Sequence, residues 1–63
     1  MNYLRVLMNR NIYVFEYEEA LLVRNSIDNS IRNNDNWCIF NTKEYGKLYL
    51  NINLIESIEF KKI

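Results

Sequence analysis

The chain has 63 residues, of which 49% are hydrophobic and 25% charged, a composition typical of one small folded domain and too little chain for two. Eight basic and eight acidic residues cancel, so no overall field favours duplex nucleic acid or an anionic membrane. With no histidine, one cysteine and one glycine, the sequence lacks Ser/His and Cys/His catalytic pairs, a Cys/His metal site and the glycine-rich loops that bind phosphates.

Location and cofactors follow from the same composition. No stretch approaches the roughly 18 apolar residues of a membrane-spanning helix, and the apolar run at the start is too short for a secretory signal. The single cysteine, Cys38, cannot form an intrachain disulfide and suits a reducing compartment. We therefore expect a cytoplasmic protein that contacts no membrane, has no metal or other cofactor and is not an enzyme.

Two strands joined by a tight turn are predicted at the start of the chain. Residues Tyr3–Met8 and Ile12–Tyr17 are rich in β-branched and aromatic side chains, and Asn9–Asn11 lies between them. Asparagine tolerates the left-handed conformation that a tight reversal needs. The sequence therefore predicts a hairpin with a short loop.

A helix is predicted over residues Glu18–Arg32. Its apolar residues recur at the three-or-four spacing of one helix face, at Ala20, Val23, Ile27 and Ile31. Carboxylates gather at its start, where the positive end of the helix dipole favours them, at Glu16, Glu18 and Glu19. The polar run Asn33–Asn36 is expected to end the helix.

Three more strands are predicted at Trp37–Thr42, Lys47–Ile52 and Ser57–Lys61. The first two form a second hairpin, in which Gly46 can supply the positive φ of the turn. The element order is then β-β-α-β-β-β. This order predicts a single α+β domain over residues 1–63, with one antiparallel sheet and one helix packed on one face of it.

Alternation along the strands divides their side chains between two faces. One face is apolar and is expected to pack against the helix; its members are Leu4, Val6, Met8, Ile12, Val14, Cys38, Phe40, Leu48, Leu50, Ile52, Ile58 and Phe60. The other face mixes aromatic, basic and amide side chains; its members are Tyr3, Arg5, Leu7, Tyr13, Phe15, Tyr17, Trp37, Ile39, Asn41, Lys47, Tyr49, Asn51, Ser57, Glu59 and Lys61. Because one helix cannot cover both faces, the second face would expose a larger apolar patch than a soluble monomer usually shows.

Three interpretations of the second face stay open. It is a subunit interface, since such interfaces are enriched in aromatic residues and arginine. It is a platform on which aromatic rings stack against a base while a basic residue contacts phosphate. Or it is a surface that binds a different protein.

The candidate ligand-binding residues combine aromatic stacking with positive charge. They are Arg5, Tyr13, Trp37, Lys47 and Tyr49 on the second face, Tyr45 at the tip of the second hairpin and Arg24 on the helix. Arg5 or Lys47 would contact a phosphate, and Tyr45 would act as a lid or an anchor. Arg24 would reach the pocket of a neighbouring subunit. Cys38 is expected to be a small buried hydrophobic residue.

Chain length also predicts assembly. A chain of this size buries only about 60% of the surface that its unfolded state exposes, so its stability as a single subunit is marginal. Such small domains usually gain additional stability from disulfides or metals. The sequence provides neither a cysteine pair for a disulfide nor a Cys/His set for a metal. We therefore expect a homodimer or a higher closed oligomer.

The composition as a whole resembles that of a known class of small proteins. Eleven asparagines, eight isoleucines and no proline indicate translation from a very AT-rich genome. In length, neutrality and composition the chain resembles the small accessory and anti-defence proteins of bacteriophages that infect low-GC Gram-positive bacteria. The resemblance carries no diagnostic motif, and it implies a protein that acts by binding and blocking, as anti-CRISPR inhibitors and nucleotide-sequestering sponges do.

Two functional hypotheses follow. The first is a non-enzymatic, homo-oligomeric phage-type binding protein, an anti-defence factor of the host cytoplasm that sequesters a small nucleotide immune signal or inhibits a host defence protein. The alternative is a regulator that binds single-stranded nucleic acid by stacking bases on the aromatic sheet face. Extended duplex nucleic acid is not expected as a partner, because proteins bind it through a long stripe of basic residues that the sequence lacks.

Overall fold

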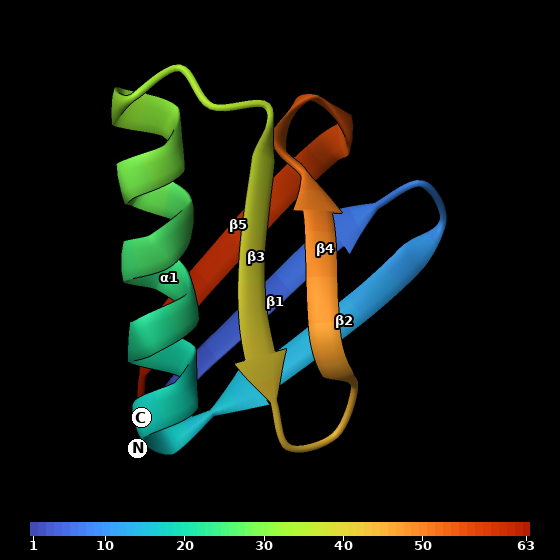
Figure 1. The fold of residues 1–63 in the computed structure, drawn as a ribbon. Coiled ribbons are helices and arrows are strands. Elements are labelled where there is room, and N and C mark those ends of the chain that lie inside the picture. The colour runs from blue at the N-terminus through green and yellow to red at the C-terminus, as the bar shows by residue number, and fades with distance from the viewer.

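The computed structural model describes residues 1–63 and confirms the α+β class (Figure 1). Its elements in chain order are β1 (Asn2–Met8), β2 (Asn11–Glu16), α1 (Tyr17–Arg32), β3 (Trp37–Thr42), β4 (Gly46–Asn51), the 3₁₀ turn η1 (Ile52–Leu54) and β5 (Ile55–Lys62). Helix and strands follow one another in the predicted order, and the last strand begins two residues earlier than predicted.

The strands form two antiparallel sheets, whereas the sequence predicted one. The first has the order β2-β1-β5, and the second is the β3–β4 hairpin alone. In Figure 1 the hairpin and α1 lie side by side in one layer, in front of the three-stranded sheet. The physical reason is that one helix is too narrow to cover the apolar face of three strands. The hairpin therefore packs its apolar side on the rest of that face instead of extending the sheet.

The β1–β2 turn explains one error in the predicted face assignment. Asn9 and Arg10 both have positive φ, at 49° and 66°, as the two central residues of a type I′ hairpin turn do. The loop therefore has two residues and not three, and Asn11 already pairs with Met8. A shift of one residue moves every following side chain of β2 to the opposite face.

The inner face of β2 is accordingly formed by Tyr13 and Phe15. Phe15 lies opposite Leu4 in the ladder and is 1% exposed, whereas Ile12, which the sequence assigned to the core, is 50% exposed. The predicted assignment of β2 was therefore wrong. The assignment of β1 was correct, because Leu4, Val6 and Met8 of that strand are all buried.

The helix contributes Ala20, Val23 and Ile27 to the core, as predicted, but the fourth predicted residue is exposed. Ile31 is 51% exposed, and Ser30 is the buried residue at that turn. The complete core consists of Leu4, Val6, Met8, Phe15, Ala20, Val23, Ile27, Cys38 and Leu50. Together with Ser30 these are the only ten buried residues, so the folded chain has a small core.

Both ends of α1 use left-handed residues. At its start, Tyr17 has φ 58°, which turns the chain sharply from β2 into the helix. At its end Asn34 also has φ 58°, and the amides of Asn34 and Asp35 donate to the carbonyls of Ile31 and Ser30 at 3.2 and 2.9 Å respectively. This is the Schellman pattern of helix termination, and it confirms that the asparagine-rich run ends the helix.

Candidate functional site

The outward side of the β3–β4 hairpin exposes three large apolar side chains. Cross-strand pairing places Ile39 beside Tyr49, Trp37 beside Asn51 and Asn41 beside Lys47, and residues opposite each other share a face. We call these six residues the hairpin face. Trp37, Ile39 and Tyr49 are 53%, 52% and 54% exposed, so three large side chains lie together in solvent.

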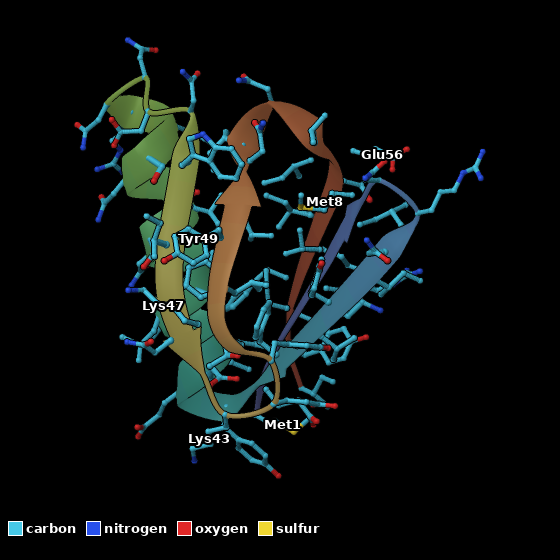
Figure 2. The ribbon with its side chains drawn as sticks, turned by 45° about the vertical axis from the view of Figure 1, so that its right-hand side comes forward. Met1, Met8, Lys43, Lys47, Tyr49 and Glu56 are labelled. Carbon is cyan, nitrogen blue, oxygen red and sulfur yellow. The ribbon has the colours of Figure 1, made fainter.

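One cation accompanies these side chains. The Lys47 ammonium lies 5.8 Å from the ring centroid of Tyr49, within the range of a cation–π contact, and Figure 2 shows both side chains on the outward side of the hairpin. Lys47 has no ion-pair partner, because the one salt bridge of the molecule joins Lys61 to Glu59. Its charge is therefore available to a ligand.

Arg5, the other predicted phosphate contact, lies on a different surface. It belongs to β1 and sits between Val14 of β2 and Glu59 of β5 in the ladder. Its face of the three-stranded sheet points away from the hairpin, because the opposite face of that sheet carries the core. The single mixed face of the prediction is therefore divided between two opposite surfaces, and Arg5 does not join Trp37 and Tyr49.

Tyr13 and Tyr45 lie between the two layers. Their rings meet edge to face at a centroid distance of 5.2 Å, and Tyr45 also meets Phe15 at 5.7 Å. The Tyr45 hydroxyl accepts a hydrogen bond from the backbone amide of Val14 at 3.2 Å, at the outer edge of β2. Tyr45 thus anchors the hairpin to the three-stranded sheet, and neither ring is free to stack on a ligand.

Arg24 makes its contacts within the single chain. Its guanidinium carbon lies 4.4 Å from the ring centroid of Phe60, and one of its terminal nitrogens donates to the Asn25 side chain at 3.3 Å. Its Nε atom is buried without a hydrogen-bond partner. These contacts fix Arg24 over the core side of β5, so the structure does not bring it near the hairpin face.

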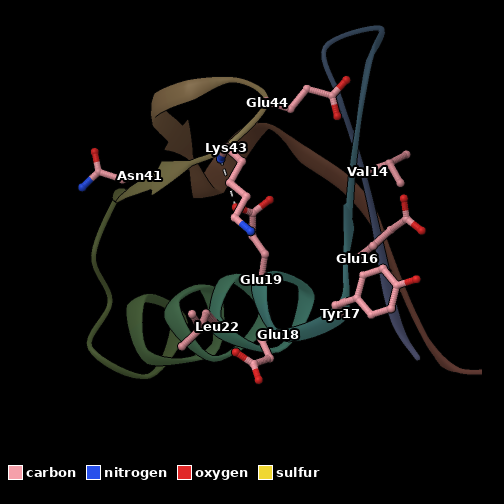
Figure 3. A pocket seen from close by; sticks show the side chains of 9 residues that line it. All are labelled: Val14, Glu16, Tyr17, Glu18, Glu19, Leu22, Asn41, Lys43 and Glu44. Atoms are coloured by element: carbon pink, nitrogen blue, oxygen red, sulfur yellow. Dashed lines mark hydrogen bonds between the residues drawn. The ribbon is translucent and has the colours of Figure 1, made fainter.

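A hollow between the start of α1 and the turn of the β3–β4 hairpin has the wrong charge for a phosphate. It measures about 640 Å³ and is lined by Val14, Glu16, Tyr17, Glu18, Glu19, Leu22, Asn41, Lys43 and Glu44 (Figure 3). Glu19 accepts a hydrogen bond from the Lys43 amide at 3.1 Å, which ties the hairpin turn to the start of the helix. Four carboxylates against one lysine repel an anion, so a nucleotide gains nothing from this hollow.

The sequence could not reveal this hollow, whereas it placed all six residues of the hairpin face on the predicted second face. Glu44 follows Glu19 by 25 positions, and only the packing of the hairpin beside the helix brings them together. Ile39 was assigned to the second face but not to the site. The signal that would have found it is its position two residues after Trp37 on the same strand.

Metal and thiol chemistry receive no support from the geometry. No group of three histidine, cysteine, aspartate or glutamate side chains is placed to hold a metal ion. Cys38 is buried, and burial raises the pKa of its thiol above the ordinary value, while a hydrogen bond with Ser30 offsets part of that effect. A protonated, enclosed thiol is a poor nucleophile.

The helix of this fold is neither long nor apolar enough to cross a membrane. Comparison of the chain with protein-family models, with curated proteins and with solved structures finds no match.

Proposed function

We propose that this protein is a non-enzymatic, homo-oligomeric binding protein whose binding surface is the hairpin face. The observation that carries the proposal is the group formed by Trp37, Ile39 and Tyr49, each more than half exposed on one hairpin. Tryptophan and tyrosine are the residues that most often dominate binding energy at protein interfaces. Exposing them costs solubility, and a binding role accounts for that cost.

A macromolecular target fits this surface better than a small nucleotide. Small-molecule sites are concave and enclose most of their ligand, whereas the acidic hollow includes only Asn41 of the hairpin face. Of the two activities implied by the resemblance to phage anti-defence proteins, inhibition of a host protein is thus favoured over sequestration of a nucleotide signal. The phage-type role itself remains part of the proposal.

The second candidate is binding of single-stranded nucleic acid. It is favoured by the unpaired Lys47 beside the Tyr49 ring and by the amides of Asn41 and Asn51 on the same face. Aromatic rings on a flat sheet can stack successive bases, amides can bond base edges, and a lysine can contact the backbone. Because the face carries a single cation, contacts with phosphates would contribute little of the binding free energy, so binding would be weak and only mildly salt-dependent.

The only tryptophan of the chain provides a direct test. Trp37 emission reports on the hairpin face, so it is followed during titration with cyclic dinucleotides and with short single-stranded oligonucleotides. Lys47→Ala and Arg5→Ala remove the same charge from opposite surfaces, which makes them a matched pair. Oligonucleotide binding that Lys47→Ala weakens and Arg5→Ala leaves unchanged would select the second candidate.

The protein-target hypothesis needs a covalent readout. A photocrosslinking amino acid at Ile39 on the hairpin face is compared with the same amino acid at Leu7, whose strand position places it on the opposite surface. We expect one defined crosslinked protein from Ile39 and none from Leu7 in extracts of the producing cells. Equal crosslinking from both positions, or none from Ile39 together with no response of Trp37 to any nucleotide, would contradict the proposal.

A further inference from the structure

The outer edge of β4 is a strand edge without a partner. β4 is hydrogen-bonded to β3 only. The Ile52 amide donates to the Asn36 carbonyl at 2.8 Å, which continues the ladder by one pair. Since bonded and non-bonded pairs alternate in an antiparallel ladder, Leu50 and Leu48 bond to β3. The N–H and C=O groups of Lys47, Tyr49 and Asn51 therefore point to the open edge.

The other edges of the two sheets carry features that block pairing. The β2 edge has the Val14 amide occupied by the Tyr45 hydroxyl. The β5 edge strand bears four charged side chains, at Glu56, Glu59, Lys61 and Lys62, and the ladder beside it has an irregularity at Leu7/Met8. Charges and bulges are the usual protection of edge strands. β3 lies beside α1 (Figure 1).

β4 has little protection of that kind. Its sequence is Gly46-Lys47-Leu48-Tyr49-Leu50-Asn51, with one charge and three consecutive apolar residues. Alternation places Tyr49 on the outward side, while Leu48 and Leu50 face inward. A strand of this kind is a ready template for a further strand.

We propose that two copies of this chain pair through their β4 edges, antiparallel and about a twofold axis, so that the two hairpins form one four-stranded sheet. The inference rests on the homo-oligomeric binding protein proposed above and specifies how its subunits meet. A twofold axis at Tyr49 places this residue opposite Tyr49 of the second copy. Lys47 then lies opposite Asn51 of the second copy, and Leu48 opposite Leu50.

This register is the one that the strand itself favours. It joins every free N–H and C=O group of the edge, whereas a shift by two residues in either direction leaves some of them unpaired. It places the outward faces of the two hairpins on the same side of the joined sheet, because residues opposite each other share a face. It also keeps the two Lys47 side chains apart and opposite amides, which avoids like-charge repulsion across the axis.

The assembly would double the binding surface. Each hairpin contributes Trp37, Ile39 and Tyr49 to the same outward side, and the axis joins the two hairpin faces at Tyr49. A second copy is thus preferred over an unrelated peptide strand as the occupant, because its alternation matches that of the edge and its Lys47 meets a neutral amide and not a second cation.

Disulfide trapping tests the register. Residues at position 49 of the two copies form a directly opposed pair with Cα atoms about 5.5 Å apart, within reach of a disulfide. The matched control is Lys47→Cys, on the same strand and the same face, whose equivalents lie about 13 Å apart in this register. Cys38 is buried and serves as an internal control. We expect Tyr49→Cys to form a disulfide-linked dimer on mild oxidation and Lys47→Cys to remain unlinked.

A second variant isolates the backbone edge. The chain is short enough for chemical synthesis with an N-methyl group on Tyr49, which removes one donor at the edge and leaves the β3 ladder intact. We expect the dissociation constant of the dimer, measured by sedimentation, to rise about tenfold or more, since two hydrogen bonds are lost per dimer. Circular dichroism verifies that the methylated chain still folds.

The outcomes separate this inference from the proposed function. A wild-type chain that stays monomeric, equal disulfide yields at positions 47 and 49, or a dimer insensitive to N-methylation would overturn the edge pairing. Trp37→Ala leaves the β4 edge intact, so it should remove target binding while the dimer persists. Loss of the dimer in Trp37→Ala would place the seam on the hairpin face and refute the edge mode. Failure to bind any target, with the position-49 disulfide formed, would refute the function alone.

Discussion

Truncation of Phe15 tests the packing of β2, the strand that the sequence assigned to the wrong face. Phe15 is 1% exposed and meets Phe40 and Tyr45 edge to face, at centroid distances of 5.9 and 5.7 Å. Loss of a fully buried side chain costs about 1.5 to 3 kcal/mol in transfer alone, and the cavity left behind raises the typical cost of Phe→Ala to about 3 to 5 kcal/mol. We expect Phe15→Ala to lower the free energy of unfolding by that amount.

The assay must allow for the small size of the chain. At about 0.05 to 0.15 kcal/mol per residue, 63 residues give a total stability of about 3 to 9 kcal/mol, so Phe15→Ala could unfold the protein completely. Urea titration of Phe15→Leu, a milder truncation, is therefore measured beside it. All variants are compared at one protein concentration, because the proposed assembly would contribute to the apparent stability.

The control on the same strand is Ile12→Ala. Ile12 is 50% exposed, so its truncation should cost less than about 1 kcal/mol. The reversed result, with Ile12→Ala costing more than Phe15→Ala, would refute the β1–β2 register and the two-residue turn that produces it.

Three further predictions concern single contacts. Tyr45→Phe removes the hydroxyl that accepts a hydrogen bond from the Val14 amide. It should lower the free energy of unfolding by about 1 kcal/mol and speed hydrogen exchange of that amide. An unchanged exchange rate would mean that the hydrogen bond is not formed. Tyr17 has a left-handed φ of 58°, which costs any residue with a Cβ about 1 to 2 kcal/mol, and its side chain is 65% exposed. Tyr17→Gly should therefore raise the melting temperature, and a lower melting temperature would mean that the ring contributes more stability than the strain removes. Burial raises the pKa of Cys38 above 9.0, so the folded state keeps this proton longer than the unfolded state. The contribution of Cys38 is complete below about pH 9 and is lost as the pH rises through the folded pKa, so the stability difference between wild type and Cys38→Ala should shrink there.

The sequence was sufficient to predict the elements because local signals specify them. Positive φ at Asn9 and Asn34 occurs where asparagine predicted a turn and a helix end. The buried residues Ala20, Val23 and Ile27 follow the predicted helical spacing. These features depend on neighbours within one turn of the chain, and such neighbours are visible in the sequence.

The buried faces of the strands were harder to predict, because they depend on the exact loop length between strands and on how the two sheets pack on each other. One residue in the length of the β1–β2 loop decided whether Ile12 or Tyr13 faced inward. Whether the second hairpin extends the first sheet or covers it decided whether Arg5 and Trp37 share a surface. The alternation along a strand shows which of its residues share a face. It does not show which of the two faces is buried, or which element covers that face.

The two-layer arrangement also explains why the remaining candidate site is the hairpin face. A hairpin that covers another sheet must turn one side inward, and Cys38, Phe40, Leu48 and Leu50 occupy that side. The outward residues are then free of any packing requirement, and polar side chains there would have cost the core nothing. That Trp37 and Tyr49 stand there is thus not a consequence of folding the single chain. The contacts beyond the single chain that we propose would account for these rings, and we place the first of those contacts at the open β4 edge beside them.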